Sequence, residues 1–254
     1  MARIFITGSA DGLGQRAARA LISRGHDVYL HARSPARAQE AMDACPGAKD
    51  AFVADLSSVQ ETKELAQKLR DVAPSWDAVV HNAGVVHGVQ GTTGKEGIPT
   101  LFAVNTLAPY VVTALLGNRS ARYVFLGSGA HVAGDATLQD IQKCDYSDSK
   151  LHNILLAFWF GRHFKSRGEK VDCSAMDPGR VPTKMGGWDA PDNIDKATDT
   201  YVMLAEGSGA AKGKEGGYWY QCSARAHMRE VGDKAVQDKL VKQLEEISGT
   251  KMSD

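Results

Sequence analysis

Ile4-Phe5-Ile6-Thr7-Gly8-Ser9-Ala10-Asp11-Gly12-Leu13-Gly14 joins an apolar segment to a helical pattern through a glycine-rich turn. We expect a buried strand over residues 3–7 and a helix from residue 13 onwards. The glycines allow a tight turn and let the backbone approach a pyrophosphate, and the start of the helix offers free N–H groups and a positive dipole end. The stretch therefore predicts a strand–turn–helix that binds a dinucleotide.

The rest of the chain continues this alternation of short apolar runs and amphipathic segments. Such an order predicts an α/β protein, a single-domain Rossmann fold whose doubly wound parallel sheet of about seven strands carries helices on both faces. We expect strands at about 3–7, 27–31, 50–54, 77–81, 121–126, 170–175 and 217–220. Helices are expected at about 13–24, 35–44, 58–72, 100–117, 146–166 and 231–247.

No linker or repeat divides residues 1–254, so one domain is expected. The glycine-rich stretch 184–216 predicts a mobile substrate lid, and the polar end at about 248–254 predicts a frayed tail.

Composition excludes several classes of partner. Lysine and arginine together number 30, as do aspartate and glutamate, so neither nucleic acid nor an anionic membrane is expected as partner. The longest apolar run noted, Leu151–Phe160, is too short to span a bilayer, and no secretory signal is visible at the N-terminus. The four cysteines lack zinc-ligand spacing and predict reduced thiols in a cytoplasmic protein without a metal site.

Tyr146-Ser147-Asp148-Ser149-Lys150 places a phenol and an ammonium four residues apart, on one face of a helix. A phenol with its ordinary pKa of about 10 is a poor proton donor at neutral pH. A cation fixed beside it stabilises the phenolate, which favours general acid–base chemistry.

These motifs resemble the short-chain dehydrogenase/reductase family from Arg3 to about Tyr220. The landmarks occur in the order of that family: TGSADGLG (7–14), Asp55-Leu56, HNAG (81–84), Asn105, Ser128, YSDSK (146–150) and PGRVPT (178–183). His81 departs from the pattern, since the family usually has asparagine there, and we interpret it as a structural residue.

The resemblance implies four catalytic roles. Tyr146 would exchange a proton with the substrate oxygen, and Lys150 would hold the nicotinamide ribose and lower the pKa of the tyrosine. Ser128 would hydrogen-bond the substrate oxygen, and Asn105 would hold a water that links Lys150 to solvent. A serine hydrolase using Ser128 with His131 or His152 is not supported, because no nucleophile elbow surrounds the serine; we place the two histidines at the pocket rim and on the helix surface, respectively.

The resemblance also implies the cofactor contacts and transfer of the pro-S hydride. Asp55 could equally cap the following helix. The expected contacts are Gly8, Ser9, Asp11, Gly12, Leu13, Gly14, Asp55, Leu56, Asn82, Ala83, Gly84, Tyr146, Lys150, Pro178, Gly179, Val181 and Thr183.

The end of the second strand predicts NADP(H), with NAD less favoured. Ala32 stands where an acidic residue would grip the ribose hydroxyls, and Arg33 and Ser34 follow it. A guanidinium can bind a 2′-phosphate through two hydrogen bonds. The alternative is that Arg33 is a solvated loop charge.

The expected substrate is a small carbonyl compound or alcohol, with Trp188 either a wall of its pocket or an ordinary surface aromatic. The segment 146–166 is apolar nearly all round, and in many relatives such a helix pairs with 100–117 in a dimer interface. We expect a homodimer or homotetramer, unless the C-terminal segments of the same chain cover this helix. Two other functions stay open: a dinucleotide sensor on the same fold, and an epimerase or dehydratase that uses the same tyrosine and lysine.

Overall fold

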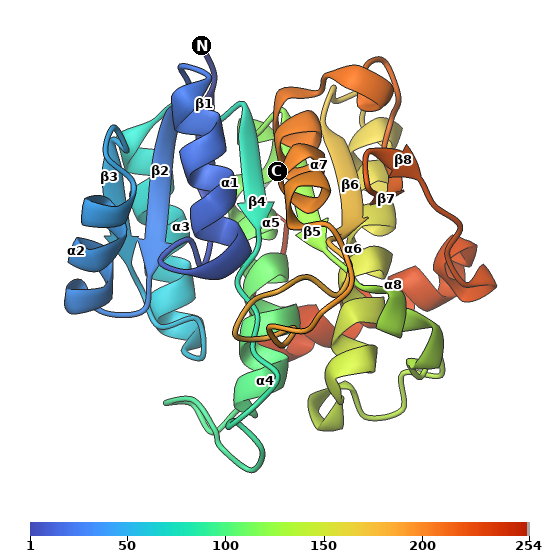
Figure 1. Cartoon of the computed structure of the whole chain (residues 1–254). Coiled ribbons are helices and arrows are strands. Elements are labelled where there is room, and N and C mark those ends of the chain that lie inside the picture. Colours follow the sequence, from blue (N-terminus) through green and yellow to red (C-terminus); the bar gives the residue numbers. More distant parts are fainter. Residues whose placement is uncertain (253–254) are drawn as a thin grey trace.

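The computed structural model describes residues 1–252 and contains one eight-stranded sheet with the order β3-β2-β1-β4-β5-β6-β7-β8 (Figure 1). All neighbours pair in parallel except β8, which runs antiparallel to β7. The strands are β1 (Arg3–Ile6), β2 (Asp27–Ala32), β3 (Asp50–Val53), β4 (Ala78–His81), β5 (Arg122–Leu126), β6 (Asp172–Asp177), β7 (Gly217–Tyr220) and β8 (Ser223–Ala224). The seven predicted strands are confirmed, and the two-residue β8 is an addition that the sequence analysis missed.

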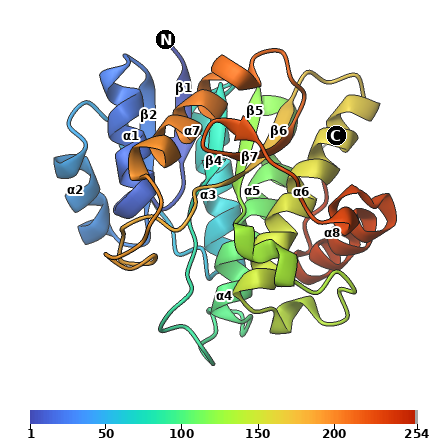
Figure 2. The ribbon, with the colours of Figure 1, turned by 45° about the vertical axis from the view of Figure 1, so that its right-hand side comes forward.

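Helices cover both faces of the sheet, as Figure 2 shows. One apolar core lies between the sheet and the side that carries α3, α5, α6 and α8, and a second lies on the side that carries α1 and α7. The helices are α1 (Gly12–Ser23), α2 (Pro35–Ala44), α3 (Val59–Val72), α4 (Thr100–Phe102), α5 (Ala108–Leu116), α6 (Tyr146–Ser166), α7 (Ile194–Glu206) and α8 (Lys234–Ser248). A π-helical turn over Ala103–Leu107 joins α4 to α5.

The strand order reverses between β1 and β4, because the chain first builds outward through β2 and β3 and then returns to the other side of β1. Ligands of open α/β sheets bind in the crevice at the carboxyl ends of the strands near such a reversal. The fold therefore brings the glycine-rich turn after β1 beside the loops that follow β4, β5 and β6.

The stretch 184–216, predicted as a mobile excursion, contains a helix in its middle part. Residues 194–206 form α7, which packs against α1, and its Tyr201 and Leu204 are buried. The Asn193 side chain caps the helix by accepting hydrogen bonds from the N–H groups of residues 195 and 196, and Gly207 ends it in a left-handed conformation. Of the glycines that suggested a loop, Gly207 marks the end of a core helix.

The C-terminal helix α8 covers the outer face of α6. Trp159 Nε1 donates to Asp238 Oδ1 at 2.9 Å, and Arg162 Nε donates to Gln237 Oε1 at 3.2 Å. Apolar residues of α8 lie in the same core as α6. The apolar surface of α6 is therefore covered by its own chain, so the interface predicted for α6 and the 100–117 segment conflicts with the structure.

The end of the chain is also tied to this layer. The Tyr110 hydroxyl donates to the Thr250 carbonyl at 2.9 Å, and Ser248 and Thr250 are buried. The predicted fraying from 248 is wrong up to Thr250, because the chain after α8 runs against α5. Residues 253 and 254 lie outside the described residues.

The continuous helical stretch Thr100–Arg119 is 20 residues long with a mean hydropathy of 1.5, enough in length and composition to cross a membrane. The sequence analysis overlooked it, having taken Leu151–Phe160 as the longest apolar run. Because 78 % of its most apolar part is buried inside the molecule, core packing accounts for its composition.

Candidate active site

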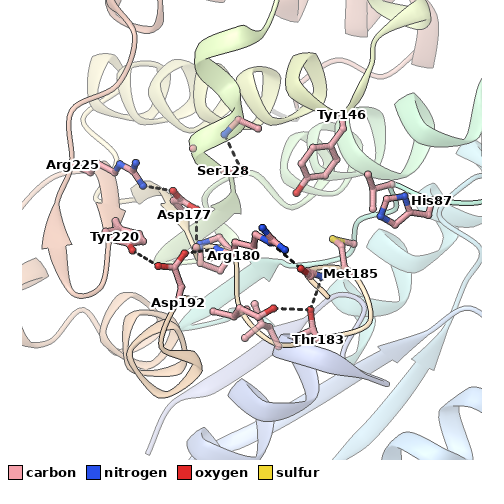
Figure 3. A pocket seen from close by; sticks show the side chains of 18 residues that line it. His87, Ser128, Tyr146, Asp177, Arg180, Thr183, Met185, Asp192, Tyr220 and Arg225 are labelled. Carbon is pink, nitrogen blue, oxygen red and sulfur yellow. Dashed lines mark hydrogen bonds and ion pairs between the residues drawn. The ribbon is translucent and has the colours of Figure 1, made fainter. Parts of the chain in front are cut away.

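A cavity of about 480 Å³ opens at the carboxyl ends of β5 and β6, under the loop that follows β6 (Figure 3). Ser128, Tyr146 and Asp177 line it from the sheet and α6, and Arg180, Thr183 and Met185 line it from the loop. Sequence reasoning thus placed the serine and the tyrosine correctly in one pocket, although they lie 18 positions apart in the chain.

Tyr146 is fixed as the first residue of α6 by a capping box. The Asp145 side chain accepts from the N–H of Asp148, and the Asp148 side chain accepts from the N–H of Asp145. Burial raises the pKa of the Tyr146 phenol, a hydrogen bond with the Ser128 side chain lowers it, and the Asp177 charge raises it further. The net shift is upward, so the phenol holds its proton at neutral pH.

Lys150 is buried one turn further along α6, with Nζ 5.3 Å from the centre of the Tyr146 ring. Its Nζ donates to the Leu126 carbonyl at 3.0 Å, and the Asn153 amide donates to the same oxygen at 2.9 Å. Burial lowers the pKa of Lys150 to about 8. The lowering of the Tyr146 pKa by Lys150 stays a prediction, since burial is the largest influence on the phenol and raises its pKa.

Asn105 lies in the π-helical turn and is fully buried. Its side chain bonds both backbone groups of Val85, accepting from N at 2.8 Å and donating to O at 2.9 Å, and it donates to Ser149 Oγ at 3.1 Å. One lone pair of Oδ1 is left. A Cβ on Gly84 would lie 3.5 Å from both this oxygen and Lys150 Nζ. The water relay stays a prediction, and Oδ1 is the atom of this side chain that could serve it.

The glycine-rich turn fits a pyrophosphate because it cannot accept side chains where the backbone is tightest. Gly8 has a φ of +60°, and a Cβ there would lie 2.8 Å from Ala83 Cα. A Cβ on Gly14 would lie 2.3 Å from Asn82 Nδ2, whereas one on Gly12 would meet nothing within 4 Å.

His31 in β2 supports this turn, a role that sequence reasoning missed. Its Nδ1 accepts from Gly8 N at 3.0 Å, so Nε2 carries the proton and donates to the Ala54 carbonyl at 3.0 Å. Burial lowers the pKa of His31 to about 4. The neutral ring therefore holds the glycine turn and β3 together.

Ser9 and Asp11, both predicted to contact the cofactor, make hydrogen bonds and ion pairs within the protein. The Ser9 hydroxyl is buried, donates to the Ile6 carbonyl and accepts from His31 N. The Asp11 side chain caps α1 at Gly12 N and pairs with Lys184 of the loop after β6. Leu13 lines the cavity.

Two arginines lie close to the end of β2. The first, Arg33, was predicted, and the second, Arg37 in α2, was missed by the sequence analysis. Arg33 is exposed, and Ser34 caps α2 by accepting from Arg37 N at 3.4 Å. The Arg37 guanidinium points back to the glycine turn, where Nη2 lies 3.6 Å from Asp11 Oδ2. The sequence did offer a signal for Arg37, because it follows Ser34, the residue that caps α2, by three positions.

The remaining predicted cofactor residues lie along the same edge of the sheet. Asp55 accepts from the backbone N and the hydroxyl of Ser57, as a turn-capping residue does, and Leu56 is buried. The Asn82 amide donates to the carbonyls of Thr7 and Gly8 and accepts from the Tyr201 hydroxyl at 2.7 Å. This amide braces the turn from beneath, next to Ala83 and Gly84.

The loop after β6 closes the cavity through Pro178, Gly179, Val181 and Thr183, all of which line it. Thr183 Oγ1 accepts from Gly186 N at 3.1 Å, which folds the loop back on itself. Trp188 is 75 % exposed and is not among the lining residues, so of the two interpretations the structure favours the surface aromatic.

Two histidines are misplaced by the sequence analysis. His131 is buried behind Ser128, where its Nδ1 donates to the Ser128 carbonyl at 2.7 Å and its Nε2 accepts from Met228 N. His152 is buried and hydrogen-bonds Thr106 Oγ1 at 3.2 Å. Neither lies at a rim or on a surface, because the segment after β8 packs against His131 through Met228 and the π-helical turn packs against His152 through Thr106. His81 is buried at the end of β4 and stacks on Tyr123, as a structural residue does.

Asp177 and Arg225 form an ion pair at the cavity that sequence reasoning missed. Asp177 could have been noticed as a polar residue at the end of a strand, directly before Pro178-Gly179. Arg225 offers no such signal, because it follows β8 in a segment without a motif.

Replacing Gly14 by alanine is expected to destabilise the chain by about 1–3 kcal/mol, because overpacking forces the neighbouring backbone to move. The new Cβ would lie 2.7 Å from the Gly8 carbonyl as well as against Asn82. Denaturant unfolding measures the loss, with Gly232→Ala as control because a Cβ there meets nothing within 4 Å. Equal stability of the two variants would contradict the tight approach at Gly14.

Comparison with known proteins gives one consistent picture. A family model described as short chain dehydrogenase matches residues 2–193. An uncharacterized oxidoreductase of Emericella nidulans is 40 % identical over 253 residues, covering 98 % of each chain. Short-chain dehydrogenase chyC of Penicillium rubens is 39 % identical over 264 residues, covering 99 % of each.

Solved structures share the fold. An uncharacterized protein of Mycobacterium paratuberculosis aligns with a TM-score of 0.79 at 20 % identity, covering 100 % of this chain and 96 % of that one. RhlG of Pseudomonas aeruginosa, in an active-site complex with NADP, aligns with a TM-score of 0.64 at 24 % identity, covering 84 % and 93 %.

Proposed function

The chain belongs to the short-chain dehydrogenase family, and from that premise we propose that it is an NADP(H)-dependent oxidoreductase that reduces a small carbonyl compound. The observation that carries the proposal is the joint placement of Ser128, Tyr146 and Lys150 beside a cavity at the carboxyl ends of the strands. The nicotinamide, when bound, supplies the hydride; the residues of this chain position the substrate and move the proton.

In the proposed reaction the substrate oxygen lies between the hydroxyls of Ser128 and Tyr146. Ser128 donates a hydrogen bond that orients the oxygen, and Tyr146 transfers its proton to the oxygen as negative charge develops there. Lys150, whose Nζ sits beneath the Tyr146 ring, stabilises the phenolate that remains. Because burial raises the pKa of Tyr146, the phenol is protonated but is a weaker acid than an ordinary tyrosine. Proton transfer therefore depends on the stabilisation of the phenolate that we assign to Lys150.

The experiment follows NADPH and NADH oxidation at 340 nm with a panel of aldehydes and ketones. NADPH turnover on members of the panel is the expected result. Binding of NADPH without any turnover would instead favour a dinucleotide sensor, and a tightly held cofactor that co-purifies and is regenerated within each cycle would favour an epimerase or dehydratase.

NADP preference is proposed from the end of β2. Arg33→Ala is expected to weaken NADPH binding by about 10- to 150-fold while NADH binding changes little, because a hydrogen bond to a charged phosphate contributes about 1.5–3 kcal/mol. Cofactor titration by fluorescence measures this, with Arg37→Ala tested alongside because its guanidinium also reaches the glycine turn. Equal losses for NADPH and NADH would contradict a 2′-phosphate contact.

A homodimer or homotetramer stays a prediction, and because α8 covers α6 it would have to use another surface than the one expected. We also propose a cytoplasmic location, which the four free cysteines support.

A further inference from the structure

A charged side chain that the proposed chemistry does not use stands at the wall of the cavity. Asp177 ends β6 with only 3 % of its surface exposed. One carboxylate oxygen accepts from Gly179 N at 2.8 Å, and the other pairs with Arg225. A buried carboxylate is costly unless it is paired, so this aspartate needs a cation.

Arg225 is held as that cation by three contacts. Its Nη1 pairs with Asp177, its guanidinium lies 4.7 Å from the centre of the Tyr220 ring, and its backbone N donates to the Tyr218 carbonyl at 2.7 Å. The hairpin of β7 and β8 thus positions Arg225 at the cavity. Asp177 and the Tyr220 ring hold the plane of its guanidinium group. Figure 3 shows Arg225 and Asp177 along one side of the pocket, across from His87.

The pair leaves guanidinium donors unengaged at the wall of the cavity. A guanidinium carries five N–H groups, and the hydrogen bonds of the described residues engage only Nη1. The second terminal nitrogen, Nη2, lies 3.5 Å from where a Cβ on Gly129 would stand. Gly129 directly follows Ser128 and has no side chain, so it leaves this nitrogen uncovered one residue away from the hydroxyl proposed to orient the carbonyl.

The charges around this donor favour a neutral acceptor over an anion. Asp177 balances Arg225, and Asp192, which accepts from the Tyr220 hydroxyl at 2.9 Å, places a second carboxylate nearby. Arg180 also lines the cavity, but its side chain is turned to Asp189 and the Gly186 carbonyl. A carboxylate substituent would meet two carboxylates, whereas a neutral carbonyl oxygen accepts from Nη2 without that repulsion.

We propose that Arg225, held by Asp177 and Tyr220, forms a second substrate subsite that binds a neutral carbonyl oxygen of the substrate while a different carbonyl is reduced at Ser128 and Tyr146. The inference rests on the proposed carbonyl reduction and narrows its substrate class to dicarbonyl and keto-ester compounds. Arg225 is then a specificity-determining residue, and the hydride and proton transfers are those given above.

The test compares matched substrates with NADPH. The first pairs are 2,4-pentanedione against 2-pentanone and 1-phenyl-1,3-butanedione against 1-phenyl-1-butanone; ethyl acetoacetate against acetoacetate separates a neutral acceptor from an anion. In the wild type we expect kcat/KM to be about 10- to 150-fold higher for the dicarbonyl member, the range that a hydrogen bond to a charged donor gives. Most of the difference should appear in KM.

Arg225→Lys is the informative variant, because lysine keeps a cation for Asp177 but lacks the second donor nitrogen of the planar fork. The dicarbonyl preference should fall toward one in this variant, and Arg229→Lys, an exposed arginine of the same C-terminal segment, should keep it. The double variant Asp177→Asn with Arg225→Gln removes both charges and should lose the preference without leaving a buried charge unpaired. Thermal unfolding and NADPH titration confirm that each variant is folded and binds cofactor.

Three results would overturn the subsite. A wild type that reduces monoketones as well as dicarbonyls, a preference that survives in Arg225→Lys, or a preference for acetoacetate over its ethyl ester each contradicts it while leaving carbonyl reduction standing. A wild type that binds NADPH and reduces none of these compounds overturns both the subsite and the proposed function.

Discussion

Replacing Tyr146 by phenylalanine is expected to lower kcat/KM for carbonyl reduction by about 10²- to 10⁴-fold, the contribution of a positioned general acid. The phenyl ring keeps the shape that packs over Lys150, while the proton donor beside Ser128 is lost. NADPH affinity should change little, because the ring and the lysine remain in place. The loss should therefore appear in kcat rather than in cofactor binding.

Steady-state kinetics with NADPH, together with a fluorescence titration of the cofactor, measure both quantities. Tyr29→Phe is the matched control, since Tyr29 lies in β2 among Phe52 and Trp76 and far from the cavity lining. A Tyr146→Phe variant that reduces carbonyls at the wild-type rate would show that another group supplies the proton.

Acidification from pH 7 to pH 5 is expected to remove a large part of the stability of the fold. Burial lowers the pKa of His31 and His152 to about 4 and that of His81 to about 3. Because these values lie below the ordinary 6.5, the unfolded chain binds more protons as the pH falls, and stability that is complete above about pH 6.5 is lost below it. Between pH 7 and pH 5, each histidine lowers the free energy of unfolding by on the order of 2 kcal/mol. The sum for the three histidines approaches the whole stability of an ordinary domain.

Urea unfolding at a series of pH values measures the slope of the free energy of unfolding against pH. His81→Phe keeps the stacking on Tyr123 and removes one titrating group, so its slope should be shallower by up to about 1.4 kcal/mol per pH unit. NADPH affinity should hold from pH 7 to about pH 5 and fall only near pH 4, where His31 becomes protonated and can no longer accept from Gly8 N. A stability that is flat between pH 7 and pH 5 would contradict the buried neutral histidines.

The elements predicted best are those whose local signals agree with their packing. Residues 35–44 were expected as a helix and form α2 with those bounds, because Ser34 caps the N-terminus and Pro35 suits the first turn. The parallel strands were visible as apolar runs, since both faces of such a sheet are buried. By contrast, α7 was overlooked because its glycine-rich surroundings resemble a loop, and β8 is too short to carry a pattern.

The site divides in the same way. The spacing of Tyr146 and Lys150 and the position of Ser128 at the end of a strand could be interpreted from the chain, because a helix turn and a strand end are local geometry. Asp177 and Arg225 form their ion pair only when β6 and the β7–β8 hairpin come together, and no sequence motif indicates that Arg225 belongs to the site. The upward shift of the Tyr146 pKa was likewise beyond the sequence, because the burial that causes it depends on the whole fold.

By itself the sequence determined the doubly wound sheet, the dinucleotide turn and the tyrosine–lysine pair, because each depends on residues close together in the chain. Only the tertiary structure decided what covers α6, why His31 is neutral, and which cation faces Asp177. These features depend on segments far apart in sequence, such as α8 against α6 and residue 225 against residue 177. Their energies come from burial and charge pairing, which exist only once the layers of the fold have closed.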